Sequence, residues 1–208
     1  MSPVSLRSGE HGRTFVDLLV EVVLITVGVF LALWANSWHE DSEHRAQAQA
    51  ALRNFAGEME ANREATESNR SYHETLAREL DQFLHSNEPP SQDRFNKEVH
   101  FEGVRPVIYE HTAWDLALAT QALSYLKPDL AFDISKVYTQ QNAFQTLENS
   151  FLASAYTPAS MSSDNLKGLA PAIRLYLGDV NQQEPALIIR YETAIPEIKR
   201  ALTGDAAR

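Results

Sequence analysis

The sequence contains no cysteine among its 208 residues. A disulfide framework, a thiolate nucleophile and a zinc site built on cysteine are therefore excluded. Basic residues are also few, since 18 lysines and arginines stand against 28 aspartates and glutamates, for a formal net charge of −10. This balance argues against nucleic acid as a partner, because phosphates repel an acidic surface. It also argues against a body that lies flat on an anionic bilayer.

Catalytic motifs are lacking as well. The sequence has no glycine-rich phosphate loop, no serine nucleophile elbow and no zinc-protease helix. Histidine and acidic residues that could bind a metal cluster from His39 to His44. Glu40 and His44 are four residues apart on one helix face, but two ligands do not close a site. We interpret this cluster as a solvated helix start and expect no enzyme activity, no metal and no cofactor. Carboxylates brought together only by the fold remain the one catalytic arrangement that the sequence leaves open.

Long apolar runs are lacking too, with one exception near the N-terminus. Residues 15–38 read FVDLLVEVVLITVGVFLALWANSW, with no charge from Val22 to Ala35. About 20 apolar residues make a helix long enough to cross a bilayer. A cleaved signal peptide has a shorter apolar centre and then a small-x-small site, whereas here that pattern occurs only at 46–50, beyond charged residues. The sequence predicts an uncleaved transmembrane anchor at 15–38, between a short tail (1–14) and a body (39–208).

The flanks of this anchor predict its orientation. Arg7 and Arg13 lie on the short N-terminal side, whereas residues 39–45 are mostly acidic or histidine. Because lysine and arginine favour the cytoplasmic side, we expect a cytoplasmic N-terminus and a periplasmic body in a bacterial inner membrane. Trp34 and Trp38 are predicted interface anchors at the outer boundary.

One face of the anchor carries acidic and small residues. An acidic side chain at membrane depth costs about 2.5–3.5 kcal/mol, so it usually faces a partner, a polar cavity or the headgroups. Small residues four apart let a second helix approach closely. We therefore expect this stripe to pack against another transmembrane helix. In the alternative, the two acidic side chains lie near the cytoplasmic interface and reach the headgroups. The stripe comprises Asp17, Glu21, Gly28, Ala32 and Ala35.

The segment from Glu21 to Leu33, EVVLITVGVFLAL, is followed by Asn36-Ser37-Trp38-His39-Glu40. These residues resemble the opening of an uncharacterised family of bacterial single-pass membrane proteins. Val20 departs from that family's pattern, which has glycine there. The resemblance implies an anchored helical body and brings no activity and no functional residues.

The anchor is expected to continue into a long helix, because residues 39–85 contain no proline and one glycine. Ten residues recur at steps of three and four, as in a coiled-coil seam. The middle of this seam is polar, and we interpret His73 there as a layer that fixes helix register; a pH-sensing role would require its burial. The seam consists of Leu52, Phe55, Met59, Asn62, Thr66, Asn69, His73, Leu76, Leu80 and Phe83.

Further helices complete a predicted all-α bundle. Thr112 is expected to cap a helix that is apolar on most sides and therefore central. Pro185 is expected in the first turn of a separate last helix, which Pro196 would kink. The expected elements are a connector at 91–111 (a short strand or an ordered loop), helices at 112–126 and 129–156, a loop at 157–164, and two helices marked by residues 166–176 and 188–202.

Two classes of function fit this layout. The first is an accessory or scaffold subunit of a membrane protein complex, and the second is a periplasmic ligand-binding or sensory bundle. A tail of about 14 residues is too short for an output domain, which favours the accessory subunit. Pairing of two copies through the seam fits either. A cavity enclosed by Asn62, Thr66, Asn69 and His73 would favour the sensor, whereas packed or solvated polar layers would count against it.

Overall fold

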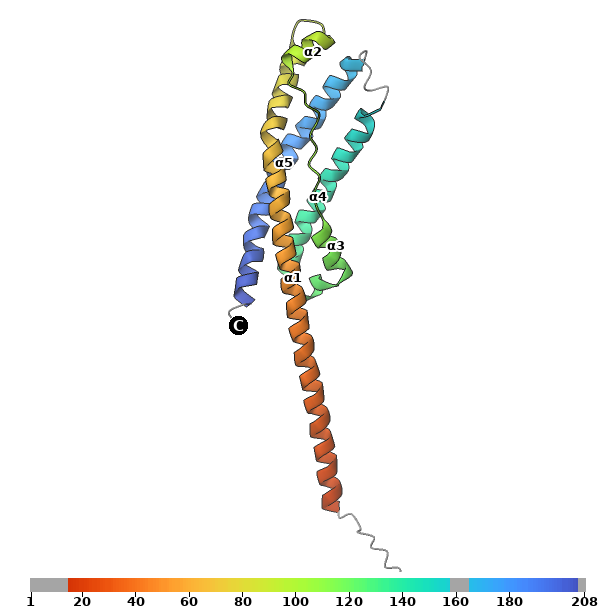
Figure 1. Ribbon diagram of the computed structural model, residues 1–208, viewed down its shortest axis with the longest axis vertical. Helices are drawn as coiled ribbons and strands as arrows, with labels where there is room; N and C mark the ends of the chain where they lie inside the picture. The colour runs from red at the N-terminus through yellow and green to blue at the C-terminus, as the bar shows by residue number, and fades with distance from the viewer. Residues whose placement is uncertain (1–14, 158–164, 206–208) are drawn as a thin grey trace, which may run out of the picture. The chain divides into compact units, whose positions relative to one another are not determined.

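The computed structural model describes residues 15–157 and 165–205 (Figure 1). Secondary structure within these ranges is helical and includes no strand, which confirms the predicted all-α class. Residue contacts divide the chain into two compact units, 1–46 and 47–208. The elements in chain order are α1 (Phe15–His85), α2 (Gln92–Glu98), α3 (Thr112–Ala119), the 3-10 helix η1 (Ala122–Tyr125), α4 (Pro128–Ala155) and α5 (Leu166–Asp205).

The described part of the first unit is the N-terminal portion of α1. Its apolar side chains are exposed, with Phe15 at 78% and Leu24 at 66% of their full accessible surface. Within the described ranges, α1 is the one helix that is long and apolar enough to cross a membrane, judged by length and composition. An apolar helix that buries none of this surface against its own chain needs an apolar environment or a partner.

The second unit is built around the predicted seam on the rest of α1. Nine of the ten seam residues are buried and Asn69 is half-buried. They pack against the chain's own α4 and α5, as the contacts of Phe55 with the Tyr138 ring and of His73 with Glu184 illustrate. The seam is therefore not available for the pairing of two copies that the sequence suggested, because the protein's own helices occupy it.

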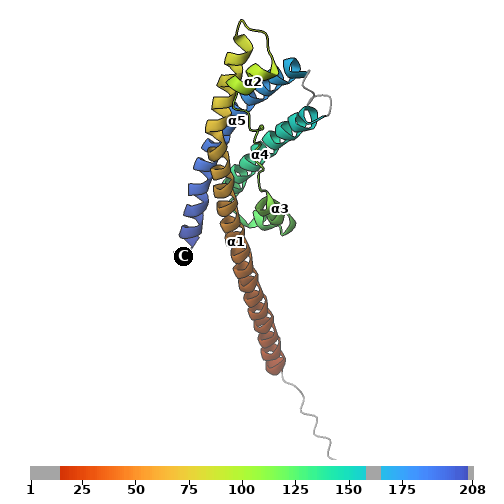
Figure 2. The same cartoon turned by 45° about the horizontal axis from the view of Figure 1, so that its top comes forward.

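The direction of α5 relative to this part of α1 follows from two ion pairs. Arg174 contacts Asp81 at 2.7 Å, and Lys199 contacts Glu60 at 2.5 Å. Residue numbers rise along one helix as they fall along the other, so the two helices are antiparallel. Figures 1 and 2 show α5 alongside α1 in this arrangement.

The prediction of two separate C-terminal helices is wrong, because α5 is continuous over 40 residues. It contains Pro171, Pro185 and Pro196 in its interior. Each proline removes one helical hydrogen bond. Pro171 and Pro196 are exposed, where water reaches the carbonyl that each leaves unbonded. A continuous stripe holds the helix against the core, with Ile173, Leu177, Val180, Leu187, Tyr191 and Ile198 all buried.

Helix α4 confirms the prediction at 129–156 to within one residue at each end. One stripe of this helix recurs at steps of three and four and is buried, at Ile134, Val137, Gln141 and Phe144. The loop expected at 157–164 lies outside the described residues, apart from Thr157.

The predicted central helix at 112–126 is neither central nor continuous. Thr112 is its first helical residue, and His111 occupies the cap position without a side-chain cap bond. Gln121, at φ 57°, interrupts the helix before η1. Leu116 and Leu118 are about half exposed, so α3 lies at the edge of the bundle.

The connector contains α2 and then an extended segment, residues 99–111, which we call the strap. The strap is not paired as a strand, and it runs from α2 to α3 alongside α1 and α4 in both views (Figures 1 and 2). Val104, Val107 and Tyr109 are buried, whereas Ile108 is 81% exposed. The strap is thus an ordered part of the core rather than a surface loop.

Candidate functional site

The strap needs hydrogen-bond partners for its backbone, because buried peptide groups are rarely left unpaired. Side chains of α1 and α4 supply them along its length. At one end, Glu79 accepts the His100 N–H at 2.8 Å. The Tyr72 hydroxyl accepts the Glu102 N–H at 3.0 Å and donates to the Gly103 carbonyl at 2.6 Å.

The other end of the strap is held by amide side chains. Asn62 donates to the Glu110 carbonyl at 2.8 Å and accepts the Glu110 N–H at 2.9 Å, as a neighbouring strand would. Gln141 also donates to this carbonyl, at 3.3 Å, and Gln145 accepts the Tyr109 N–H at 3.2 Å. Backbone recognition therefore continues across both helices.

These contacts explain why the middle of the predicted seam is polar. Asn62 and His73 bind strap backbone, and Thr66 lies 3.4 Å from the Tyr109 hydroxyl. Asn69 instead bonds to the Ala65 carbonyl of its own helix. Three of the four polar residues in the predicted seam thus contact the strap, and the polar layers are packed against it. This packing counts against a ligand cavity in the seam.

A cluster of three ionisable side chains lies at the centre of the strap. His73, Glu148 and Glu184 come from α1, α4 and α5, and each has no exposed surface. The His73 Nδ1 lies 2.7 Å from Glu184 Oε1, and its Nε2 lies 3.0 Å from the Val104 carbonyl. Glu148 accepts the Val107 N–H at 3.1 Å. The cluster therefore joins the three long helices to the strap.

When Glu184 is a carboxylate, both ring nitrogens of His73 face acceptors, so both bonds form only if the ring carries two protons. Burial lowers the pKa of this ring, but the hydrogen bond and charge of Glu184 and the Val104 carbonyl outweigh burial. The pKa of His73 is therefore raised above its usual value of 6.5. We assign His73 as an imidazolium paired with the Glu184 carboxylate at neutral pH.

Glu148 has a different balance. Burial raises the pKa of this carboxyl from 4.5 to about 7, against the lowering effects of the Val107 N–H and the His73 charge. The nearby Glu184 raises the pKa further, because two carboxylates repel. Within the described ranges, Glu184 Oε2 has no hydrogen-bond partner. The cluster thus holds one ion pair and one carboxyl that titrates near neutrality.

A third buried acid supports the junction between the strap and α3. Glu58 accepts the Ala113 N–H at 2.8 Å and the Tyr138 hydroxyl at 2.7 Å. The Tyr138 ring stacks on Trp114 with centroids 5.1 Å apart. This arrangement connects the end of the strap, through α3, to α1 and α4.

The sequence contains a signal for these buried acids. Glu148 falls between Phe144 and Phe151, at the vacant position of the apolar stripe on α4. Glu184 likewise falls between Val180 and Leu187 on α5. An acid at a core position of a helix is unusual unless it has a partner.

The predicted membrane-helix residues all lie on the exposed surface of α1. A Cβ added at Gly28 would meet nothing within 4 Å, so this face is open to a neighbouring helix. Trp34 and Trp38 are 69% and 66% exposed. The stripe residues are Asp17, Glu21, Gly28, Ala32 and Ala35.

Two contacts of the His39–His44 cluster run along its own helix. His39 lies 3.2 Å from Glu43, and Asn36 donates to Glu40 at 2.8 Å. Among the described residues, no three histidine, aspartate or glutamate side chains are arranged to hold a metal ion.

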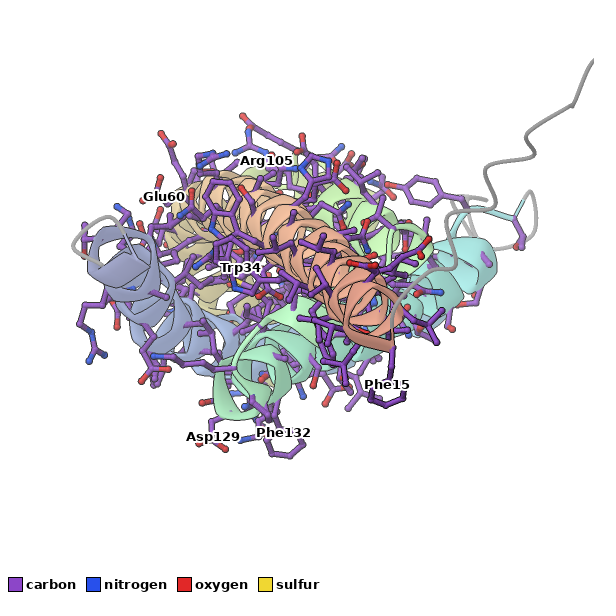
Figure 3. All side chains as sticks on the ribbon, turned by 90° about the horizontal axis from the view of Figure 1, so that it is seen from below. Phe15, Trp34, Glu60, Arg105, Asp129 and Phe132 are labelled. Atoms are coloured by element: carbon purple, nitrogen blue, oxygen red, sulfur yellow. The ribbon has the colours of Figure 1, made fainter. Side chains whose placement is uncertain are left out.

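A surface groove of about 820 Å³ lies between α4 and α5. Small side chains such as Ala143 and Ala186 line it, together with Ile189, which is 61% exposed. Phe132, 62% exposed, also lines the groove, and Figure 3 shows its ring projecting outward. Small residues beside exposed large apolar ones suit the docking of a helix.

Comparison of the chain with protein-family models, curated proteins and solved structures finds no match.

Proposed function

We propose that this protein is a non-catalytic, single-pass membrane protein that serves as an accessory or scaffold subunit of a bacterial membrane protein complex. Its N-terminus would be cytoplasmic, its anchor at 15–38 would cross the inner membrane, and its helical body would lie in the periplasm. The observation that carries the proposal is an apolar helix segment that buries none of its surface within the chain.

The open stripe on the anchor supports a helical partner rather than lipid alone. Gly28 and Ala32 present little side chain, so another helix backbone approaches closely there. Glu21 lies on the same face, where a polar group of a partner helix would offset the cost of placing a carboxyl at membrane depth.

The groove between α4 and α5 supports a second contact, made by the body. It offers an apolar floor to a helix of the same partner complex, and the charged side chains on its lining include the Lys136–Asp133 ion pair. Simultaneous contacts through the anchor and through the groove would hold the subunit more tightly than either contact alone.

The sensory alternative has less support from the seam. The strap fills the polar layers in which a ligand pocket was expected. The resemblance to a family of single-pass membrane proteins agrees with the proposal and stays a prediction.

The proposal is tested by extracting the tagged native protein in a gentle detergent and identifying by mass spectrometry what remains bound. We expect a stoichiometric set of other membrane proteins. The substitution Gly28→Ile should reduce their recovery at least fivefold while leaving membrane insertion intact, because it closes the open face and stays apolar.

The matched control is Phe30→Leu, since residue 30 lies on the opposite side of the helix. Its partner recovery should equal that of the wild type. Recovery of the protein alone, or equal loss with both substitutions, would remove the accessory-subunit proposal.

A further inference from the structure

We propose that His73, Glu148 and Glu184 form a proton-dependent latch, which holds the strap in the bundle at neutral and mildly acidic pH and loosens it as the pH rises. The latch concerns the body of the protein alone, so it does not depend on the identity of any membrane partner. The proposal rests on the geometry of three buried side chains that meet one extended segment.

The latch joins elements that are distant in the sequence. His73 bonds to the Val104 carbonyl on one side and Glu184 on the other, at 3.0 and 2.7 Å. Glu148 accepts the Val107 N–H at 3.1 Å. Two of the three side chains thus bind strap backbone directly, and the third fixes one of those two.

Loss of the second His73 proton breaks one of these bonds. The neutral ring donates from one nitrogen only, so either Val104 or Glu184 would then face a lone pair. The Glu184 carboxylate is the stronger acceptor because it is charged. The strap carbonyl of Val104 is therefore the bond that the neutral ring gives up.

Ionisation of Glu148 acts in the same direction. With His73 charged and Glu184 ionised, the cluster is neutral only while Glu148 keeps its proton. A second carboxylate would lie near Glu184, whose Oε2 already has no partner among the described residues. An excess of buried negative charge is expensive, so the cluster gains by opening to water.

The groups that face the cluster come from every element around it. Tyr109 of the strap and Tyr176 of α5 lie near the two carboxylates, and burial raises the pKa of both phenols, which keeps them neutral. The Tyr176 hydroxyl donates to Glu148 at 3.5 Å. The Tyr72 ring of α1 lies tilted beside the His73 ring, with centroids 5.8 Å apart, and Arg105 of the strap lies over the Tyr72 ring.

The ends of the strap lie outside this titrating region. Neutral amides hold Glu110, and the Tyr72 hydroxyl holds Gly103. Arg105 sits between the two latch contacts at φ 44°, a left-handed conformation that non-glycine residues rarely adopt. We therefore expect residues 104–109 to open locally while both ends stay in place.

The test is hydrogen–deuterium exchange of the full-length protein in detergent micelles at pH 6.0 and 8.5, corrected for the intrinsic rates. Protection of the Val107 and Tyr109 amides, which donate to Glu148 and Gln145, should fall at least tenfold at the higher pH. Amides at 52–59 on α1 should keep their protection, which separates local opening from global unfolding. Equal strap protection at both pH values would overturn the latch.

Two substitutions sharpen this test. Glu148→Gln keeps an oxygen that accepts the Val107 N–H but cannot ionise, so the change in protection should shrink at least threefold. Glu79→Gln is the matched control, because Glu79 also accepts a strap N–H, that of His100, outside the cluster. The control should show the full change; an equal change in both variants would contradict the proposal.

A second measurement reports on the histidine itself and needs no cluster variant. NMR of the seven histidine rings, labelled with ¹³C and ¹⁵N, distinguishes imidazolium from neutral imidazole. The His73 ring should give an imidazolium signal at neutral pH, and this signal should be absent from the His73→Gln spectrum. If that variant fails to fold, substitution of the other histidines in turn gives the assignment. A neutral His73 at pH 6 would overturn the latch.

Discussion

His73 of α1 and Glu184 of α5 form an ion pair of 2.7 Å between side chains that have no exposed surface and are 111 residues apart in the sequence. Removing one partner of such a pair strands a buried charge, which costs about 3–5 kcal/mol. We expect Glu184→Leu to lower the free energy of unfolding by this amount. Chemical denaturation of the detergent-solubilised protein, followed by tryptophan fluorescence, measures the change.

The control for this prediction is Asp81→Asn, which breaks the partly exposed pair with Arg174 between the same two helices. Exposed pairs contribute about 0–1 kcal/mol, so this variant should differ little from the wild type. Equal costs for the two substitutions would contradict the role assigned to the buried pair.

The stability of the body should depend on pH through Glu148. Because the pKa of this carboxyl is raised from 4.5 to about 7 in the folded protein, the folded state binds the proton more tightly than the unfolded chain. This contribution is complete below pH 4.5 and is lost as the pH rises from 4.5 to 7. The raised pKa of His73 acts in the same direction, since its contribution is complete below 6.5 and is lost as the pH rises through the folded pKa.

Substitution Glu148→Gln isolates the carboxyl from the histidine. When the pH is raised from 5 to 8, the wild type should lose about 2–3 kcal/mol of unfolding free energy that the variant keeps. Denaturation at the two pH values measures this difference. A constant offset between variant and wild type would show that Glu148 does not titrate in this range.

Falling pH should weaken other contacts of the body. The Arg174 guanidinium lowers the pKa of Asp81, and the His100 backbone N–H and ring outweigh burial to lower that of Glu79. Their contributions are present above the unfolded pKa values and are lost as the pH falls through the folded ones. We therefore expect the free energy of unfolding to be greatest between two ranges: the low pH at which Asp81 and Glu79 lose their contributions, and the higher pH at which Glu148 and His73 lose theirs. An optimum above pH 8 in a denaturation series would contradict this balance.

The amide of Asn62 should matter far more than that of Asn69, although both are seam residues. Asn62→Leu leaves the N–H and carbonyl of Glu110 without this partner, for a cost of about 2–4 kcal/mol. Asn69→Leu loses one bond to its own helix at a half-buried site and should stay within about 1 kcal/mol of the wild type. Denaturation midpoints of the two variants test the strap contacts directly, and similar midpoints would contradict them.

The sequence predicted the elements whose stability depends on local periodicity. The seam from Leu52 to Phe83 and the stripe on α4 recur at helical spacing, so both helices were found almost to the residue. The strap was predicted only as part of a connector, either a short strand or an ordered loop, because its backbone partners belong to distant side chains such as Asn62 and Glu148. No local pattern reveals such contacts.

The sequence predicted two helices in place of α5, because proline disfavours a helix interior. Packing of the whole stripe from Ile173 to Ile198 against the core overrides that local preference. The polar seam was predicted as a pocket or a register layer, and Asn62, Thr66 and His73 instead hold the strap. Glu148 and Glu184 were overlooked since acids break the apolar pattern by which core positions are recognised.

The claim on which the proposed function most depends is that residues 15–38 cross a membrane with the body outside the cytoplasm. The absence of cysteine makes this measurable, because a single cysteine introduced anywhere is the only thiol in the chain. The measurement is labelling of Ser5→Cys and Ser42→Cys in intact spheroplasts with a membrane-impermeant maleimide. The account predicts that residue 42 is labelled at once and residue 5 only after permeabilisation. Equal labelling of both sites without permeabilisation, or the reverse pattern, would contradict it.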